Sequence, residues 1–496
     1  MTSHGFLDSL FLRGMRHSLI ESFDDVFIFD LHGNVLKGET SPDGSEDQNV
    51  FDIKQTGISI SIFTRKKKGP EILITHSDLW GDRESTKYPF LSLHTQRSVP
   101  SKRLKPSSPD WLFVAVNEEN RAEYELGVSI NDIMPLHSLG VVTARDKFVI
   151  DFKKEALTSR LTEFAESTEV GADLDKRFGL KSSTWWSAEK ARDELPPANA
   201  MASYIRSVSY RIFDIRWCFY HSSVFESMRR PVMRNIDPGL NNLLLMTTRV
   251  VKGEPWAHVF VSEGLAEAIH LSSKTSNSAY VFPLFCYPSS NADLLDFERA
   301  ENLSKPFRRQ ITASGELTES EDIFHYMYAF LHSPVYRKRF KEFLSRSFPR
   351  IFIPRCAELG RDLCQLGKKL VSLHLMKSSN VEDPIIECFG KGDFRVEKIS
   401  YSNEKIWLDK DKTRGFNGVR EEVWNFRIGG YMVCEKWLKD RQPKKGHLGR
   451  LLVNEDIKHY QKIIFSVSET IRIMDEIDEI IDAHGGWPGA FITANP

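Results

Sequence analysis

Cysteine is rare and scattered in this chain of 496 residues. No two cysteines form a Cys-x-x-Cys pair, which argues against a zinc ribbon, and their spacing does not resemble a disulfide framework. We therefore expect reduced, mostly buried thiols in a cytoplasmic protein. The six cysteines are Cys218, Cys286, Cys356, Cys364, Cys388 and Cys434.

Long apolar runs are absent as well. No stretch of about 18 apolar residues occurs, so the sequence predicts no membrane span. The N-terminal segment MTSHGFLDSLFLRGMRHSL lacks the continuous apolar core of a signal peptide. We expect no membrane partner.

The chain also lacks a large net charge. Its formal charge is -1, with 41% hydrophobic and 27% charged residues, as in ordinary globular proteins of two to four domains. No overall field attracts nucleic acid, so any DNA binding must depend on local basic patches.

Motifs of several catalytic classes are missing. We find no HExxH, GxSxG or P-loop pattern. Asp52-Ile53-Lys54 spells the D-x-K of metal-dependent nucleases, but no second acidic residue is placed to complete a two-carboxylate metal site. The sequence therefore predicts no metal site and no catalytic residue.

The segment 207–234 is the most informative part of the chain. Aromatic and aliphatic residues alternate from Tyr210 to Tyr220, which predicts a strand. Arg229, Arg230 and Arg234 then fall within about one and a half helical turns. Guanidinium groups so close favour an anion opposite them, and phosphate and guanine both suit arginine. The alternative is a packed aromatic core with a solvated arginine rim.

A second basic cluster follows the apolar run 241–248, which reads as a buried strand. Arg249, Lys252 and Trp256 come directly after it, around a turn that contains Gly253 and Pro255. A basic and aromatic loop on a rigid strand is typical of a DNA-facing surface. The alternative is a solvated loop with a packing tryptophan.

Periodicity predicts the remaining elements. Residues 26–31 read as a buried parallel strand, 57–63 as the next strand and 153–197 as a mostly helical connector. Residues 323–343 read as two helices broken at Ser333-Pro334. The last long helix is expected over 454–481, where one apolar stripe continues at helical spacing.

Several runs carry a family resemblance. YRIFDIRWCFYHS (210–222), MRRPVMR (228–234), residues 242–271 and YVFPLFCYP (280–288) are similar to the C-terminal specificity domain of type ISP restriction–modification enzymes. These bacterial enzymes join a helicase, an adenine methyltransferase and a target-recognition domain in one polypeptide. Residues 1–34 and 49–63 resemble the methyltransferase portion just after its Asn-Pro-Pro-Tyr-type tetrapeptide.

The resemblance implies an α/β and α+β chain. We expect an incomplete methyltransferase-like domain over 1–150 with a partial Rossmann-like sheet, a connector over 151–200, and a mixed α/β target-recognition domain over 201–496 with long C-terminal helices. Phe51 matches the aromatic residue that stacks on the flipped-out adenine in the family. Its alternative is a buried aromatic at a strand entry.

Two functions of different classes remain open. The first is a module that recognises double-stranded DNA, in which we expect Arg211, Arg216, Arg249 and Lys252 to read the bases. The alternative for Arg211 and Arg216 is that they pair with Asp214 or Glu226 and only stabilise the domain. The second is one piece of a split adenine methyltransferase. In that case a methyltransferase or helicase chain supplies the missing N-terminal part, and the completed enzyme uses S-adenosylmethionine.

We predict that the isolated chain does not bind S-adenosylmethionine. No glycine-rich strand-to-helix turn precedes Val26, and the Asn-Pro-Pro-Tyr-type tetrapeptide is missing. Calorimetric titration checks this expectation, and micromolar binding would show that the methyltransferase-like portion is complete without a partner.

Overall fold

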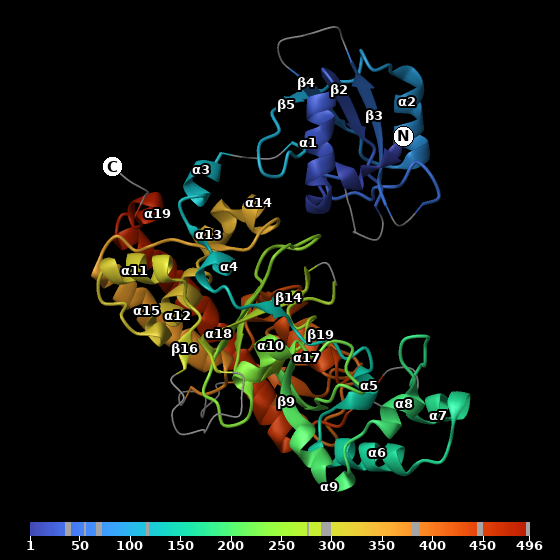
Figure 1. Ribbon diagram of the computed structural model, residues 1–496, viewed down its shortest axis with the longest axis vertical. Helices are drawn as coiled ribbons and strands as arrows, with labels where there is room; N and C mark the ends of the chain where they lie inside the picture. The colour runs from blue at the N-terminus through green and yellow to red at the C-terminus, as the bar shows by residue number, and fades with distance from the viewer. Residues whose placement is uncertain are drawn as a thin grey trace. The chain divides into compact units, whose positions relative to one another are not determined.

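The computed structural model divides the chain into two compact units, Met1–Asn120 and Arg121–Pro496 (Figure 1). The division falls ahead of the expected boundary at 150, because strands between 121 and 151 pair with strands of the second unit. The structure describes residues 1–34, 41–53, 56–65, 72–115, 119–274, 277–288, 299–378, 386–443 and 450–492.

The first unit is built on a five-stranded sheet with the order β1-β3-β2-β4-β5. Strands β2 and β4 are parallel, and the other neighbours are antiparallel. The buried strand expected at 26–31 is confirmed as β2. The elements are β1 (Thr2–Ser3), α1 (Arg13–Ser22), β2 (Asp25–Asp30), β3 (Ile58–Thr64), β4 (Leu73–Asp78), α2 (Tyr88–Leu93) and β5 (Lys102–Leu104).

Both faces of this sheet are covered, because alternate residues of β2 point to opposite sides. Val26 and Ile28 pack in one cluster with apolar residues of α1. Phe27 and Phe29 pack in another cluster with residues of α2. Figure 1 shows the two helices flanking the strands. The continuous apolar run of β2 therefore reflects a strand buried on both faces.

A buried ion pair links the loops of the first unit. Lys87 and Asp47 are fully buried, with Nζ and Oδ1 2.7 Å apart. Lys87 also donates to the carbonyl oxygens of Leu31 (2.7 Å) and Gln48 (2.6 Å). Asp47 accepts from the backbone N–H groups of Gly33 and Gly81. Each charge is thus surrounded by hydrogen-bond partners, as burial demands.

The second unit contains three four-stranded sheets. One has the order β13-β9-β10-β8, the next β12-β11-β14-β7, and the third β18-β21-β20-β19. The predicted strand over 241–248 is confirmed as β11. The strands are β7 (Ser138–Leu139), β8 (Ile150–Asp151), β9 (Ile205–Arg211), β10 (Asp214–Phe219), β11 (Leu244–Thr248), β12 (Val259–Ser262), β13 (Leu265–Ala266), β14 (Ala279–Pro283), β18 (Glu387–Phe389), β19 (Ser400–Ser402), β20 (Lys405–Trp407) and β21 (Gly415–Asn417).

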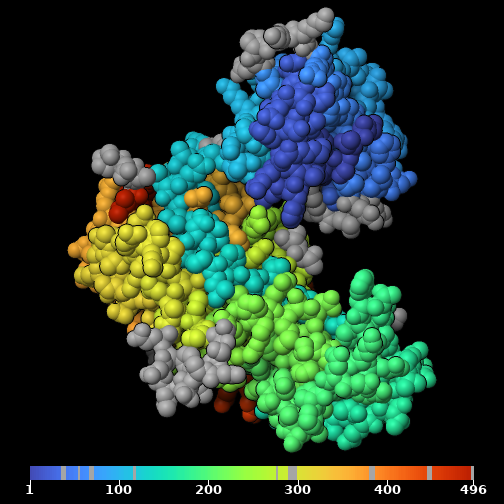
Figure 2. Space-filling view, viewed as in Figure 1, coloured from blue at the N-terminus to red at the C-terminus, as the bar shows by residue number. Residues whose placement is uncertain are grey.

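Helices complete this unit and agree with the predicted periodicity. The connector is helical, and its helices α6 to α8 lie at one end of the unit (Figure 1), where Figure 2 shows a lobe in the same green-blue colours. The helix break at Ser333-Pro334 and the long C-terminal helix are also confirmed. The main helices are α6 (Lys154–Glu166), α7 (Gly171–Phe178), α8 (Ala188–Asp193), α11 (Lys305–Ala313), α12 (Ser320–Phe330), α13 (Pro334–Arg339), α15 (Ala357–His374), α17 (Val433–Lys439) and α18 (Asn454–Ala483).

The expected single strand at 210–220 is instead a hairpin. Strands β9 and β10 pair antiparallel, with Arg211 opposite Asp214. The turn between them places Phe213 in the left-handed region, at φ 56°. No glycine, proline or asparagine marks this turn, so the residue pattern did not predict it.

The predicted basic helix is short. Helix α10 (Arg230–Met233) is followed by a 3-10 turn, η6 (Arg234–Ile236). Arg229 precedes the helix in a left-handed conformation, at φ 53°. Among the helices of the described residues, none is long and apolar enough to cross a membrane.

Lys87→Ala should lower the free energy of unfolding of the first unit by about 3–5 kcal/mol, because it leaves the Asp47 carboxylate buried without its cation. Urea unfolding, together with hydrogen exchange of the β2 amides, measures the loss. Lys105→Ala removes an exposed lysine of the same unit and is the matched control, with an expected change within about 0.5 kcal/mol. Equal stabilities of the two variants would contradict the prediction.

Candidate nucleic-acid interface

Arg216 lies in a buried charge cluster on the hairpin. Its Nη2 is 2.6 Å from Asp214 Oδ2, and Arg441 Nη2 is 3.1 Å from Asp214 Oδ1. Burial opposes ionisation of Asp214, but the two guanidinium groups outweigh it and hold the pKa of this carboxyl below its ordinary value. The guanidinium carbon of Arg216 also lies over two aromatic rings, 3.9 Å from the ring centroid of Tyr210 and 4.1 Å from that of Phe152.

Arg211, at the end of β9, has a carboxylate partner as well. Its Nη1 is 2.5 Å from Glu267 Oε2, and both side chains are buried. Burial alone lowers the pKa of Arg211, but the charge of Glu267 outweighs it, and the pKa is raised. The guanidinium group also stacks 3.9 Å over the ring of Tyr210.

These contacts match the ion-pair alternative that the sequence left open. Arg216 does pair with Asp214, but Arg211 pairs with Glu267, which the sequence analysis did not consider. Glu226 instead lies 3.6 Å from Arg145. Two of the three arginines predicted to read bases, Arg211 and Arg216, are therefore engaged inside the unit.

The arginines around α10 differ in their surroundings. Arg230 is exposed and forms two hydrogen bonds with Asp237, at 3.1 and 3.0 Å. Asp237 also pairs with Arg206 at 2.6 Å. These three side chains line a pocket of about 490 Å³ together with Tyr220. One carboxylate thus faces two guanidinium groups, which leaves this pocket with a net positive charge.

Arg229 and Arg234 are partly buried. Within the described residues, the Nε of each is buried and has no hydrogen-bond partner. Neither has an ion pair with another described residue. In the segment 229–234, Asp237 therefore neutralises Arg230, whereas no described carboxylate neutralises Arg229 or Arg234.

The loop after β11 carries two further basic residues. Arg249 is exposed and Lys252 is half-buried. Neither side chain forms an ion pair in the part of the chain that the structure describes. Because Arg249 directly follows the buried β11, its backbone is held by the sheet. These two side chains are the most available cations among the predicted base readers.

Trp256 does not lie on this exposed surface. It is 6% exposed and packs in the core of the unit, with its ring centroid 6.5 Å from that of Tyr336. The guanidinium carbon of Arg337 lies 5.7 Å from the indole ring. The sequence placed Trp256 on a DNA-facing loop, and the structure places it in the core because its large apolar ring packs there.

Glu254 holds this loop from the inside. It accepts hydrogen bonds from His258 Nε2 (2.9 Å) and Asn277 Nδ2 (2.6 Å). Burial raises the pKa of Glu254, but these hydrogen bonds outweigh it and lower the pKa to about 2. The carboxylate is therefore ionised at neutral pH and fixes the course of the loop.

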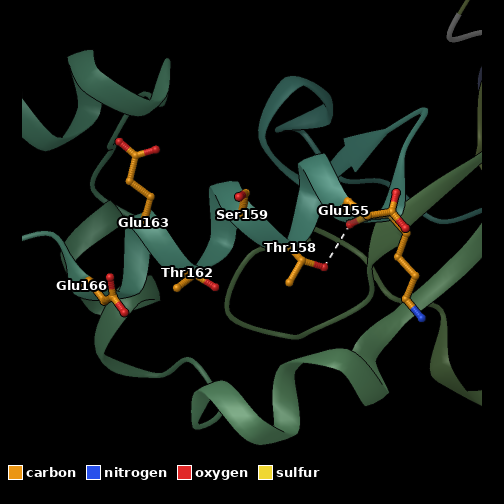
Figure 3. A pocket seen from close by; sticks show the side chains of 7 residues that line it. Glu155, Thr158, Ser159, Thr162, Glu163 and Glu166 are labelled. Carbon is orange, nitrogen blue, oxygen red and sulfur yellow. Dashed lines mark hydrogen bonds between the residues drawn. The ribbon is translucent and has the colours of Figure 1, made fainter.

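The face of α6 is hollowed but acidic. A groove of about 740 Å³ runs along the helix, and Glu155, Glu163 and Glu166 project from it (Figure 3). Three carboxylates repel phosphate, so this groove is no part of the candidate DNA surface.

Phe51 belongs to the first unit. Its side chain is 45% exposed, and its backbone N–H donates to Asn49 Oδ1 at 2.8 Å. Its carbonyl oxygen accepts from Arg83, which also pairs with Asp52 at 2.7 Å. The loop is thus fixed while the ring faces solvent, which differs from the buried aromatic of the alternative.

A family model described as the type ISP C-terminal specificity domain matches residues 132–476. The chain belongs to this family. Solved type ISP enzymes share the fold. A nuclease-deletion mutant of LlaGI in complex with a DNA substrate mimic has a TM-score of 0.68 at 19% identity, over 95% of this chain and 38% of that one.

Two other solved structures give similar values. LlaBIII bound to DNA has a TM-score of 0.69 at 18% identity, over 96% of this chain and 33% of that one. The DrdV–DNA complex has a TM-score of 0.71 at 20% identity, over 96% and 50%. This type ISP chain thus spans a third to a half of the solved chains' length. No curated protein matches it significantly.

Arg211→Ala should lower the free energy of unfolding of the second unit by about 1–3 kcal/mol, because Glu267 loses its buried hydrogen-bond donor. Burial already raises the pKa of Glu267 to about 7, so this carboxyl can take up a proton in the variant. Arg249→Ala, which removes an exposed guanidinium group, should change it by about 0.5 kcal/mol or less. Urea unfolding followed by tryptophan fluorescence compares the two. A stable Arg211→Ala protein would show that Glu267 is held by other contacts.

Proposed function

We propose that this chain recognises a specific double-stranded DNA site as the specificity portion of a type ISP restriction–modification enzyme. The match of the specificity-domain model over 132–476 carries this proposal. The fold likeness to enzymes solved with DNA supports it. The activity of the complete enzymes is not part of the proposal, because the chain spans only a part of them.

Arg249 and Lys252 are the best-supported base readers in this proposal. They extend from a loop held by β11 and Glu254, and no described carboxylate neutralises them. A guanidinium group needs a fixed backbone to meet guanine in a bidentate way, and each such contact contributes about 1–3 kcal/mol of discrimination.

Arg211 and Arg216 are less available for base contacts than Arg249 and Lys252. Each would have to leave a buried carboxylate, Glu267 or Asp214, before it could reach a base. Separation of such a pair leaves an uncompensated buried charge, which is costly. Their support of the hairpin is therefore the better-supported role, and direct reading by them stays a prediction.

The first unit is proposed to be the end of an adenine methyltransferase domain. Its sheet would complete a Rossmann-like sheet whose remaining strands, with S-adenosylmethionine, come from the missing part. Phe51 would stack on the flipped-out adenine, a role that its exposed ring suits.

A split adenine methyltransferase is the second candidate. The first unit lies outside the matched residues 132–476, and the solved chains are two to three times longer than the part this chain covers. A neighbouring open reading frame that ends in Asn-Pro-Pro-Tyr or a close variant would favour this function. Methylation of DNA by the two chains together, and by neither alone, tests it.

Selection of bound oligonucleotides from a random pool tests the recognition function. We expect a short consensus for the unmodified chain. Arg249→Ala or Lys252→Ala should relax that consensus at one position, because a base contact carries sequence information. Arg309→Ala is the matched control, since it removes an exposed arginine of α11. No consensus for the unmodified chain would contradict the proposal.

Replacement of Arg229, Arg230 and Arg234 together by alanine should weaken binding to all sequences alike. Each lost phosphate contact reduces counterion release, so the slope of log affinity against log salt should fall by about 2–3 for three contacts. Titrations at several salt concentrations measure this slope. An unchanged slope in a variant that keeps its melting temperature would show that these arginines do not bind phosphate.

A further inference from the structure

A group of imidazoles and carboxylates gathers at one edge of the first unit's sheet. Strands β2 and β4 run parallel, with Asp30 opposite Asp78, so their carboxyl ends meet at the same edge. His32 lies two residues after Asp30, and His76 lies two residues before Asp78 on β4. His4 reaches the same place from the segment after β1, which pairs with β3.

The distances within this group are those of a metal-ligand set. His4 Nδ1 lies 3.1 Å from Asp30 Oδ1, and His32 Nδ1 lies 3.6 Å from Asp30 Oδ2. One ligand atom from each of His4, Asp30 and His32 lies within 4.8 Å of the others. Zinc–ligand bonds of about 2.0–2.2 Å place tetrahedral ligands about 3.3–3.5 Å from one another. Small side-chain movements therefore bring the three atoms around one ion.

The imidazoles are fixed before any ion arrives. The ring of His32 stacks on that of Trp80, with centroids 3.3 Å apart, and its backbone N–H donates to Asp30 Oδ1 at 3.0 Å. His32 takes a left-handed backbone conformation, at φ 50°. A Cβ at Gly57 would lie 2.5 Å from the ring of His4, so only glycine leaves room for this imidazole. Fixed ligands of this kind favour selective metal binding.

Asp78 gives the group an open side. Its carboxylate lies 2.9 Å from His32 Nε2 and 3.7 Å from His76 Nδ1, and its side chain is 43% exposed. Asp30, His76 and Asp78 form a second set of ligand atoms within 4.8 Å of one another. His76 is buried, and its Nε2 has no hydrogen-bond partner among the described residues. An ion can enter beside Asp78, while the remaining ligands are shielded from water.

We propose that His4, Asp30 and His32 bind a divalent transition-metal ion of the zinc class, with Asp78 at the open side. Imidazole with carboxylate is a donor set typical of zinc and its neighbours, whereas magnesium and calcium prefer oxygen alone. The two carboxylates balance the charge of the ion. The sequence predicted no metal site, because these ligands come from separate segments that only the sheet brings together.

The alternative is a set of hydrogen bonds without an ion. His4 with Asp30 and His32 with Asp78 are close enough to bond directly. The 3.6 Å between His32 Nδ1 and Asp30 Oδ2 is too long for such a bond, and His76 Nε2 is buried without a partner. An ion between His32 and Asp30 accounts for the first feature, because it would hold both atoms at this separation. It does not account for the second, since His76 lies outside the proposed ligand set.

Metal titration of the chelator-treated chain tests the proposal. Calorimetry should show tight binding of zinc, and cobalt should give visible absorption bands without a thiolate-to-cobalt charge-transfer band. His32→Ala and His4→Gln should each weaken zinc binding at least about 10–100-fold, the loss seen even for residues that only support a ligand. Asp78→Asn, at an exposed position, should weaken it while it leaves the fold intact.

Two control variants make the outcome decisive. His94→Ala removes another histidine of the first unit and should leave zinc binding unchanged. Cys364→Ser removes the thiol of a second group, Asp322, His325 and Cys364 in the other unit, and should also have no effect. Absence of zinc and cobalt binding in the unmodified chain overturns the proposal. So does binding that survives His4→Gln and Asp78→Asn, or that is lost in Cys364→Ser. DNA binding is measured separately, so neither result depends on the other.

Discussion

The carboxylate of Asp214 joins parts of the second unit that are 227 residues apart in sequence. It lies between Arg216 of its own strand and Arg441 after α17. A buried carboxylate without a partner is unfavourable. Asp214 is stable here because both arginines donate hydrogen bonds to it and neutralise its charge. This cluster therefore fastens the β9–β10 hairpin to the segment after α17, beside the hydrogen bond between His459 of α18 and the carbonyl oxygen of Phe213.

Local patterns in the sequence predicted much of the fold. Strands β2 and β11, the break before α13 and the long α18 follow from apolar periodicity and from proline. The hairpin was missed because its turn places Phe213 in a conformation that glycine or asparagine usually takes. Apolar periodicity describes one element at a time, so it could not show that the strands between 121 and 151 pair with distant partners.

The candidate site was less predictable than the fold. Arginines are easily found in a sequence, but their partners are not. Arg211 and Glu267 are 56 residues apart, so only the folded chain shows that one neutralises the other. Trp256 illustrates the same limit, because a tryptophan beside lysine and arginine suits both a binding surface and a core. The family resemblance pointed to Phe51, and its role in stacking on an adenine stays a prediction.

In the loop after β11, the residues that stabilise the backbone are different from the residues that could contact DNA. Its course depends on Glu254, His258 and Asn277, none of which is the exposed tip. Arg249 and Lys252 can therefore be exchanged for other residues at little cost in stability. The hairpin has no such freedom, because each of its arginines is also a structural partner. Within one domain, the loop can therefore change its side chains without loss of stability, whereas a change in the hairpin arginines also disturbs the fold.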